Sequence, residues 1–429
     1  MKVNLTTLGC PKNLVDSELL LGGLNGEGIE FVDDPREAET IILNTCGFIQ
    51  GAKEESIDAI LQAVEMKKQG RCTKLFVTGC LSQRYPHELA REVPEVDGFY
   101  GNRDMNQILK ELTTELNLKR EILGERLIST PRHYAYLKIS EGCENPCTFC
   151  AIPAIRGRFR SRPLEALVEE AHMLAERGVR ELLLVAQDTT IYGQDLYGKR
   201  RLAPLLDKLC DIKVFKWIRL LYTYPAHFSE DIIEIIIDKH QVIKYIDMPI
   251  QHVSDRLLRR MARKVKRKDI ESIIHKLRAG HPQLAIRTTL ISGFPGETEA
   301  DHRELCDFVE DIRFERLGLF TYSREQGTPA SHFPDQVSDH IMQERWAELN
   351  DLQTQVSFEL NQGLVGKTLE VVIDAYQSDL GVFVGRTGSD CPEIDNSVSI
   401  EEQELIIGRF YSTKIMTCGD HELQGRITV

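Results

Sequence analysis

Short runs of branched and aromatic residues alternate with longer amphipathic segments through the first 110 residues. Residues 15–24 and 54–68 place apolar side chains at helical spacing, which predicts two helices, and Pro86 is a suitable first residue for a third, short helix. Strands that alternate with helices indicate an α/β domain with a doubly wound parallel sheet. The predicted strands are residues 2–7, 39–45 and 74–78.

The same alternation continues over residues 134–334. Six strand–helix units fit a partial (β/α)6 barrel, whose chemistry is expected at the carboxyl ends of the strands. The predicted strands are residues 134–140, 181–186, 217–222, 245–249, 285–291 and 316–321. The predicted helices are residues 164–177, 202–210, 230–239, 255–261, 267–279 and 299–312.

The last part of the chain has a different pattern. A long helix is predicted over residues 335–361, and the short strands beyond it indicate a small antiparallel β-barrel. These strands are residues 368–375, 382–386, 398–400 and 408–415. The polar segment 110–133 is typical of a connector. We therefore expect three domains, at residues 1–125, 134–362 (with the linking helix) and 364–429.

The composition is that of a soluble globular protein, with 42% hydrophobic and 28% charged residues among 429. The apolar runs fall far short of the roughly 20 residues that a membrane-spanning helix needs, and the first residues resemble a strand rather than a signal peptide. Eleven cysteines in such a chain indicate metal or redox chemistry in a reducing compartment. We therefore expect a cytoplasmic protein with no membrane partner.

Three cysteines stand close together, with three and then two residues between them: Cys143, Cys147 and Cys150. Gly142 and Pro146 keep this segment out of a helix or strand, so a loop is expected. A closed iron–sulfur cluster takes four thiolates and a structural zinc site four ligands, so three thiolates leave one metal position open. A zinc site lacks a fourth ligand nearby, and a disulfide does not suit a reducing compartment. A cluster with one open iron is therefore favoured.

Three further cysteines, Cys10, Cys46 and Cys80, each follow one of the three predicted N-terminal strands. The carboxyl ends of parallel strands meet at one edge of a sheet, so these thiols are expected to converge there. The alternative is that each is a small buried hydrophobic residue, which is common for free cysteine. Three in consecutive strand–helix units favour a second cluster site. Cys72 precedes its strand and belongs to the opposite edge.

The spacing C-x3-C-x2-C, with Phe149 before its last cysteine, resembles the radical S-adenosylmethionine (SAM) superfamily. The stretch TLGCPKN around Cys10 resembles the N-terminal signature of the methylthiotransferases, and NTC and TGC, which end at Cys46 and Cys80, fit the same domain. The resemblance implies two 4Fe–4S clusters, SAM as a second cofactor, and Phe149 near the SAM adenine. The implied cluster ligands are Cys10, Cys46, Cys80, Cys143, Cys147 and Cys150.

The resemblance also implies a reaction with two SAM molecules. One would methylate a sulfur species on the open iron of the N-terminal cluster. The other would be cleaved at the second cluster, and the resulting radical would take a hydrogen from a substrate carbon that then collects the methylthio group. An electron donor such as a flavodoxin-type protein is expected as a partner.

Polar residues at other predicted strand ends are candidates for SAM binding. Gly293, Gly296 and Glu297 follow the strand at 285–291 and are similar to the superfamily's SAM-ribose region. Gln187 could hold SAM or substrate, but helix capping or loop hydrogen bonding is an equal alternative. Further candidates are weaker: His252, expected to be structural, and the arginines of the cysteine loop, of which one could pair with a carboxylate. These arginines are Arg156, Arg158, Arg160 and Arg162.

The C-terminal barrel resembles a TRAM domain, a module usually associated with RNA. From Leu364 onward, however, 5 Lys and Arg face 11 Asp and Glu, a net charge of −6. Affinity for RNA comes largely from cations that neutralise phosphates, so this balance favours a basic protein partner. The basic run at 259–268 indicates at most a secondary RNA contact, since a solvated helix and turn explains it as well.

Two branches of the methylthiotransferases are therefore compared. The sequences GCPKN at Gly9 and MPIQHVSD at Met248 resemble the RimO family, which modifies the β-carbon of an aspartate in small-subunit ribosomal protein S twelve. The other branch, which modifies a transfer-RNA adenosine beside the anticodon, typically has Gln-Met in place of Pro11-Lys12. The RimO-type enzyme is the favoured hypothesis and the transfer-RNA enzyme the alternative. A non-catalytic iron–sulfur RNA-binding regulator is a distant third.

Overall fold

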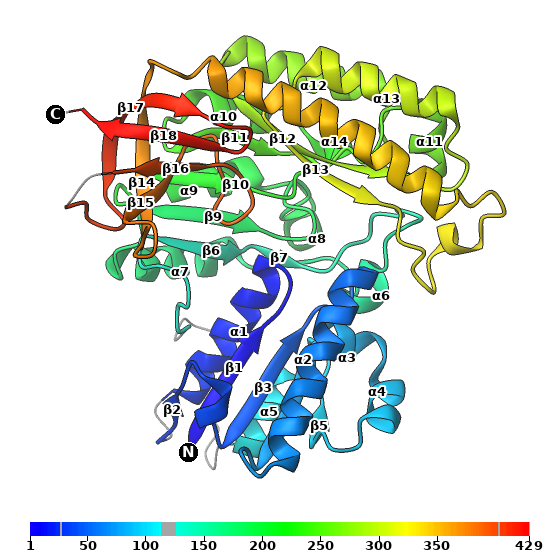
Figure 1. Cartoon of the computed structure of the whole chain (residues 1–429), viewed down its shortest axis with the longest axis vertical. Helices are drawn as coiled ribbons and strands as arrows, with labels where there is room; N and C mark the ends of the chain where they lie inside the picture. Colours follow the sequence, from blue (N-terminus) through cyan, green and yellow to red (C-terminus); the bar gives the residue numbers. More distant parts are fainter. Residues whose placement is uncertain (26–27, 113–125, 402–403, 429) are drawn as a thin grey trace.

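The structure, a computed structural model, describes residues 1–25, 28–112, 126–401 and 404–428. Three bodies follow one another along the chain (Figure 1). An N-terminal domain lies below a central barrel domain, and a small C-terminal barrel packs on the side of the central one. Most of the predicted connector, at residues 113–125, lies outside the described residues.

The N-terminal domain contains a five-stranded parallel sheet with the order β2-β1-β3-β4-β5. Ile41 and Leu43 of β3 pack among residues of α2, whereas Ile42 packs against Leu20 and Leu24 of α1. Alternate side chains of one strand therefore bury against helices on opposite faces, which confirms the doubly wound sheet. The strands are β1 (Lys2–Thr7), β2 (Glu30–Phe31), β3 (Thr40–Thr45), β4 (Lys74–Gly79) and β5 (Gly98–Phe99). The helices are α1 (Pro11–Leu24), α2 (Gln50–Lys68), α3 (Cys80–Arg84), α4 (Pro86–Glu92) and α5 (Met105–Leu112).

The central domain is an open parallel barrel with the strand order β13-β12-β11-β10-β9-β6, as predicted. Its strands are β6 (Tyr134–Lys138), β9 (Glu181–Val185), β10 (Trp217–Leu220), β11 (Val242–Asp247), β12 (Ala285–Ser292) and β13 (Arg316–Thr321). Its helices are α6 (Ile152–Arg156), α7 (Leu164–Glu176), α8 (Gln194–Tyr197), α9 (Leu202–Cys210), α10 (Glu230–Asp238), α11 (Asp255–Arg260), α12 (Arg267–Gly280) and α13 (Glu299–Ile312). A short hairpin, β7 (Ser140–Glu141) with β8 (Arg160–Ser161), brackets the cysteine loop. Among the described residues, no helix is long and apolar enough to cross a membrane.

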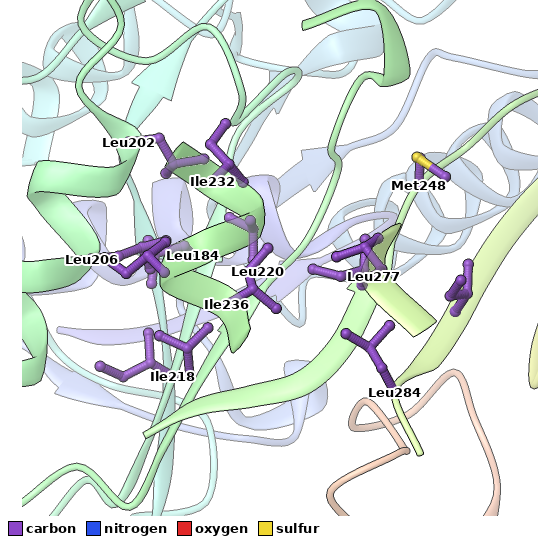
Figure 2. Close-up of a cluster of buried hydrophobic side chains, with 14 of the residues drawn as sticks. Leu184, Leu202, Leu206, Ile218, Leu220, Ile232, Ile236, Met248, Leu277 and Leu284 are labelled. Carbon is purple, nitrogen blue, oxygen red and sulfur yellow. The ribbon is translucent and has the colours of Figure 1, made fainter. Parts of the chain in front are cut away.

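The main hydrophobic core lies between the outer face of this sheet and its helices. Figure 2 shows Leu184 of β9 and Ile218 and Leu220 of β10 facing Leu206 of α9 and Ile236 of α10. Each of these side chains is almost fully buried. Burial of one such side chain is worth about 1.5–3 kcal/mol, so this layer holds the strands whose ends carry the site.

The inner face of the barrel is filled from both ends. Val15 of α1 packs there among Tyr136 and Tyr245, and Cys391 of the C-terminal barrel enters the same cluster. The segment 388–396 lies at the amino-terminal ends of the strands, where the Arg219 guanidinium donates to the Gly388 carbonyl at 3.0 Å. All three domains therefore meet inside one barrel.

The C-terminal domain is a closed barrel with the order β14-β15-β16-β18-β17. It follows α14 (Asp339–Gln362), which starts at the capping residue Ser338 rather than at 335. The pairing of β16 with β18 is parallel, and its other pairings are antiparallel. The sequence prediction lacked β18. The strands are β14 (Thr368–Gln377), β15 (Val382–Thr387), β16 (Ser397–Ile400), β17 (Phe410–Cys418) and β18 (Glu422–Ile427).

Much of the negative charge of this domain is used inside the molecule. Asp390 binds Arg316 of the central barrel at 2.5 Å, and Asp374 binds His133 at 2.7 Å. The exposed acidic residues in the described part outnumber the exposed cations. These acids are Glu370, Asp379, Glu393, Glu401, Glu404, Asp420 and Glu422, and the cations are Lys367, Arg409, Lys414 and Arg426. Part of the net charge of −6 therefore docks this domain on the central barrel, and the exposed remainder is still negative.

Candidate metal centres at the domain junction

The structure brings the three N-terminal cysteines to one edge of the sheet. Cys10 follows β1, Cys46 follows β3 and Cys80 opens α3 directly after β4. Strands β1 and β3 are neighbours where the strand order reverses, the usual place for a ligand in such sheets. The chain is tight here, because a Cβ added to Gly9, at φ +91°, would lie 3.0 Å from the Cys46 sulfur.

Electrostatics differ among these three thiols. Burial, with smaller contributions from Cys80 and Cys10, raises the pKa of Cys46 to about 11. Burial acts on Cys10 too, but the charges of Lys12 and Arg156 outweigh it and lower the pKa of Cys10 below its ordinary value. The edge thus carries cations that favour a thiolate, the form in which cysteine binds metals.

The second trio lies in the loop between β7 and α6. The Asn145 backbone N–H donates to the Cys143 sulfur at 3.4 Å, and the Arg263 guanidinium donates to the Cys147 sulfur at 3.7 Å. Burial and the neighbouring Cys147 and Cys143 raise the pKa of Cys150 to about 12. The three cysteines are therefore grouped in a half-buried setting, where metal binding must displace protons.

The distances between the sulfurs indicate whether each trio fits a single metal ion or a cluster. A single tetrahedral zinc ion with Zn–S bonds of about 2.3 Å holds its sulfurs about 3.8 Å apart. Among the described residues, neither trio has its three sulfurs within 4.8 Å of one another. His302, Cys306 and Glu348 do meet this limit, but His302 already pairs with Glu348 at 2.8 Å and Cys306 at 3.6 Å. The cysteine trios therefore fit a group larger than one metal ion, such as an iron–sulfur cluster.

A buried ion-pair network joins the two trios. Arg156, six residues after Cys150 and 2% exposed, binds Asp16 of α1 at 2.7 Å and Glu141 at 3.1 Å. Lys138 binds the same two carboxylates. Against its burial, these two cations lower the pKa of Glu141 to about 2. We call Asp16, Lys138, Glu141 and Arg156 the junction network.

Further contacts fix the two domains against each other. Helices α3 and α6 lie side by side (Figure 1), and Cys80 packs on Ala151 and Ile155. On the other side of the junction, Glu325 binds Lys53 of α2 at 3.0 Å and Arg84 of α3 at 2.6 Å. The relative placement of the two cysteine sites is therefore fixed by buried polar bonds.

An apolar pocket of about 190 Å³ opens at the same junction. Phe149 lines it together with Gln251 and Ile291 at barrel strand ends. Phe48 and Ile49, just after Cys46, close it from the N-terminal domain. Residues of both domains thus form one pocket.

The other predicted SAM contacts lie outside the lining of this pocket. The Glu297 carboxylate accepts the Gly293 N–H at 2.7 Å and binds Arg345 of α14 at 3.1 Å, so it braces its own loop. Gly296 leaves no room for a side chain, because an added Cβ would lie 2.4 Å from an Asp335 oxygen. Gln187 donates to Glu141 at 3.1 Å, which places it at the junction network.

Other polar residues at the strand ends have structural partners. The His252 Nδ1 accepts the backbone N–H groups of Val253 and Ser254 at 2.9 and 3.0 Å, and burial lowers the pKa of His252 to about 3. Asp188 accepts from Asn145 of the cysteine loop at 2.8 Å. His252 is therefore a buried neutral cap, as the sequence indicated, and Asp188 supports the cysteine loop.

Three arginines of the basic run at 259–268 have partners within the protein. Arg260 binds Asp335, Arg263 contacts Cys147 and the Pro249 carbonyl, and Arg267 binds Glu271 at 2.8 Å. Arg259, Lys264, Lys266 and Lys268 remain exposed.

Sequence reasoning missed one pair at the junction, Lys12 and Tyr222. The Lys12 Nζ lies 3.3 Å from the centre of the Tyr222 ring, and Tyr222 has φ +57° at the carboxyl end of β10. Gln251, after β11, has φ +72°. Left-handed backbone at a non-glycine residue is strained and clusters at functional sites. No sequence pattern reveals such strain.

Comparisons with known proteins agree with this architecture. The chain matches the models "Uncharacterized protein family UPF0004" over residues 2–101, "Radical SAM superfamily" over 137–309 and "TRAM domain" over 365–428. The radical SAM methyltransferase TsrM from Kitasatospora setae is 15% identical, with a TM-score of 0.55 over 82% of this chain and 89% of that one. The cobalamin-dependent radical SAM enzyme OxsB is 14% identical, with a TM-score of 0.53 over 83% and 56%. The fold and the site thus define a radical SAM enzyme.

Curated relatives narrow this class. Proteins named "Ribosomal protein uS12 methylthiotransferase RimO" from Cytophaga hutchinsonii and Clostridioides difficile are each 46% identical, over 99% and 100% of this chain and 98% and 99% of theirs. The one from Porphyromonas gingivalis is 47% identical over 99% of both chains. The chain therefore belongs to the RimO family of radical SAM methylthiotransferases. Its cofactors are accordingly SAM and 4Fe–4S clusters.

Proposed function

We propose that this enzyme transfers a methylthio group to the β-carbon of an aspartate in ribosomal protein uS12. The observation that carries the proposal is the full-length identity of about 46% to relatives named as uS12 methylthiotransferases, in a chain whose two cysteine-bearing domains meet at one junction. When bound there, two 4Fe–4S clusters and SAM supply radical chemistry that an unactivated C–H bond requires. The relatives of about 46% identity, which are named for uS12, favour this substrate over a transfer RNA.

In this proposal each trio holds one cluster, through Cys10, Cys46 and Cys80 and through Cys143, Cys147 and Cys150. The residues around them do the rest of the work. Phe149 and Gln251 line a pocket for SAM, while Gln187, Gly293, Gly296 and Glu297 shape its surroundings rather than its wall. The junction network fixes the position of one trio relative to the other.

The remaining expectations are part of the same proposal. We place the domain limits at residues 1–125, 134–362 and 364–429. A flavodoxin-type protein would donate the electron, RNA contact is secondary, and the enzyme would act in the cytoplasm.

Anaerobic reconstitution with iron and sulfide tests the function. We expect about eight irons per chain, at four per cluster. With SAM, a reductant and purified uS12, we expect 5′-deoxyadenosine release and a uS12 mass increase that matches exchange of a hydrogen for a methylthio group. Cys10→Ala and Cys143→Ala should each lose half the iron and all product, whereas Cys418→Ala in the C-terminal barrel should behave as wild type. Modification of transfer RNA but not uS12 would show that the proposed substrate is wrong.

A further inference from the structure

Lys12 is a nearly buried cation that lacks an acidic partner. It lies in the first turn of α1, two residues after Cys10, and is 8% exposed. Among the described residues, no carboxylate lies within 4.0 Å of its Nζ. Its charged or titratable neighbours are Cys10, Tyr222 and Arg156, and Arg156 carries a positive charge like Lys12. Lysine is rarely buried without an anion, because desolvation of the ammonium is costly.

The nearby carboxylates are already committed to other cations. Asp16 and Glu141 pair with Lys138 and Arg156 in the junction network. Two acids thus balance two bases, and the anionic group beside Lys12 is the Cys10 thiolate rather than a carboxylate. A buried lysine without a carboxylate partner is electrostatically suited to bind the carboxylate of a ligand.

The position of the Lys12 side chain is set by strained backbone on the opposite domain. Tyr222, beneath the ammonium, has φ +57°, and its backbone N–H donates to the Asp247 carboxylate at 3.0 Å. Asp247 is in turn held by Arg287 at 3.0 Å. Surroundings that maintain a strained residue usually do so for a function. Here the strain presents an aromatic face that keeps the ammonium at the junction without neutralising it.

We infer that Lys12 binds the side-chain carboxylate of the aspartate whose β-carbon is modified. This inference rests on the proposed function. The β-carbon is bonded directly to the carboxylate carbon, so a cation that fixes the carboxylate also fixes the carbon to be modified. Lys12 stands beside Cys10 of one trio, and Arg156 links its neighbourhood to the loop of the other. A carboxylate bound there lies at the boundary of the two cysteine sites.

The test compares aspartate with its uncharged isostere. Reconstituted wild-type enzyme and the variants Lys12→Met and Lys12→Arg are assayed for affinity to uS12 that carries Asp or Asn at the modified position. We expect wild type to prefer Asp roughly tenfold or more, as for a hydrogen-bonded charge pair. Lys12→Met should reduce this preference to about twofold or less, and Lys12→Arg should retain most of it. Lys199→Met, an exposed lysine of the same chain, should match wild type.

Iron content, the preference for Asp over Asn and modification of uS12 together distinguish the possible outcomes. The inference is supported if Lys12→Met keeps about eight irons and loses the preference for Asp over Asn. A variant that keeps the wild-type preference would overturn it, and so would loss of iron from Lys12→Met, because Lys12 would then serve the metal centre. If wild-type enzyme leaves uS12 unmodified, the proposed function itself fails. Wild-type activity with an unchanged preference in Lys12→Met would overturn only this inference.

Discussion

Single buried polar residues at the strand ends determine the local geometry of this site. His252 caps the segment after β11 with its Nδ1, and Glu297 binds two backbone N–H groups of its own loop. Both stand in motifs that sequence reasoning associates with ligand binding. In each case the backbone hydrogen bonds are made within the loop, because buried N–H groups must be satisfied. These residues shape the strand ends without touching the pocket.

His252 makes stability depend on pH. Burial lowers the pKa of His252 to about 3, whereas an unfolded histidine has a pKa of about 6.5. Between these values the unfolded chain binds one more proton, so stability is full above about pH 6.5 and falls by up to about 1.4 kcal/mol per pH unit below it. His252→Asn, whose side-chain oxygen can accept the same N–H groups, should reduce this slope in urea unfolding from pH 7 to 5.

The matched control for this prediction is His340→Asn, since the His340 side chain is 80% exposed. It should leave the slope at the wild-type value. Equal slopes in wild type and His252→Asn would show that His252 is not the responsible group.

At the scale of elements, the segment 388–396 acts as a plug for the central barrel. Asp390 is fully buried and binds Arg316, the first residue of β13, while Tyr245 of β11 donates to Asp395 at 2.7 Å. Acidic residues of the C-terminal domain thus neutralise cations on the inner face of the central barrel. The TRAM domain is part of the structure of the catalytic barrel.

Asp390→Asn tests the plug. It leaves the buried Arg316 guanidinium without its carboxylate, and loss of one partner of a buried pair costs about 3–5 kcal/mol. We expect a decrease of that order in the free energy of unfolding, measured by urea titration. Asp379→Asn, an exposed acid of the same domain, should change it by less than about 0.5 kcal/mol. Similar stabilities of the two variants would contradict the role of the plug.

The elements that the sequence predicted are those with a clear hydrophobic period. All six barrel strands and the central N-terminal strands meet this condition. β2 and β5 have two residues each, too few to show a pattern. The first turn of α1, at residues 11–14, was missed because it buries Lys12 and Asn13, whose partners Tyr222 and Thr45 lie in other parts of the chain. Polar burial of this kind follows from tertiary contacts and leaves no periodic signal.

For the whole molecule, the decisive feature is how the domains face one another. The cysteine positions follow from strand order, since parallel strands end at one edge. The junction network does not, because Arg156 and Asp16 are 140 residues apart and their pairing depends on docking. The same holds for the bond of Lys53 to Glu325 and for Lys12 above Tyr222. Sequence reasoning therefore reached both cysteine sites but not what aligns them.

Arg156→Met should loosen this alignment. The change leaves Asp16 with Lys138 alone and removes the bond from Arg156 to Glu141, so a loss of about 3–5 kcal/mol is expected for a disrupted buried pair. In reconstituted protein reduced with dithionite, the magnetic coupling between the two clusters should weaken in the electron paramagnetic resonance spectrum, while iron per chain stays near wild type. Arg158→Met is the matched control, because that side chain is two residues away and 91% exposed. If both variants kept the wild-type coupling, the domains would be aligned by the Glu325 contacts and the barrel core instead of the junction network.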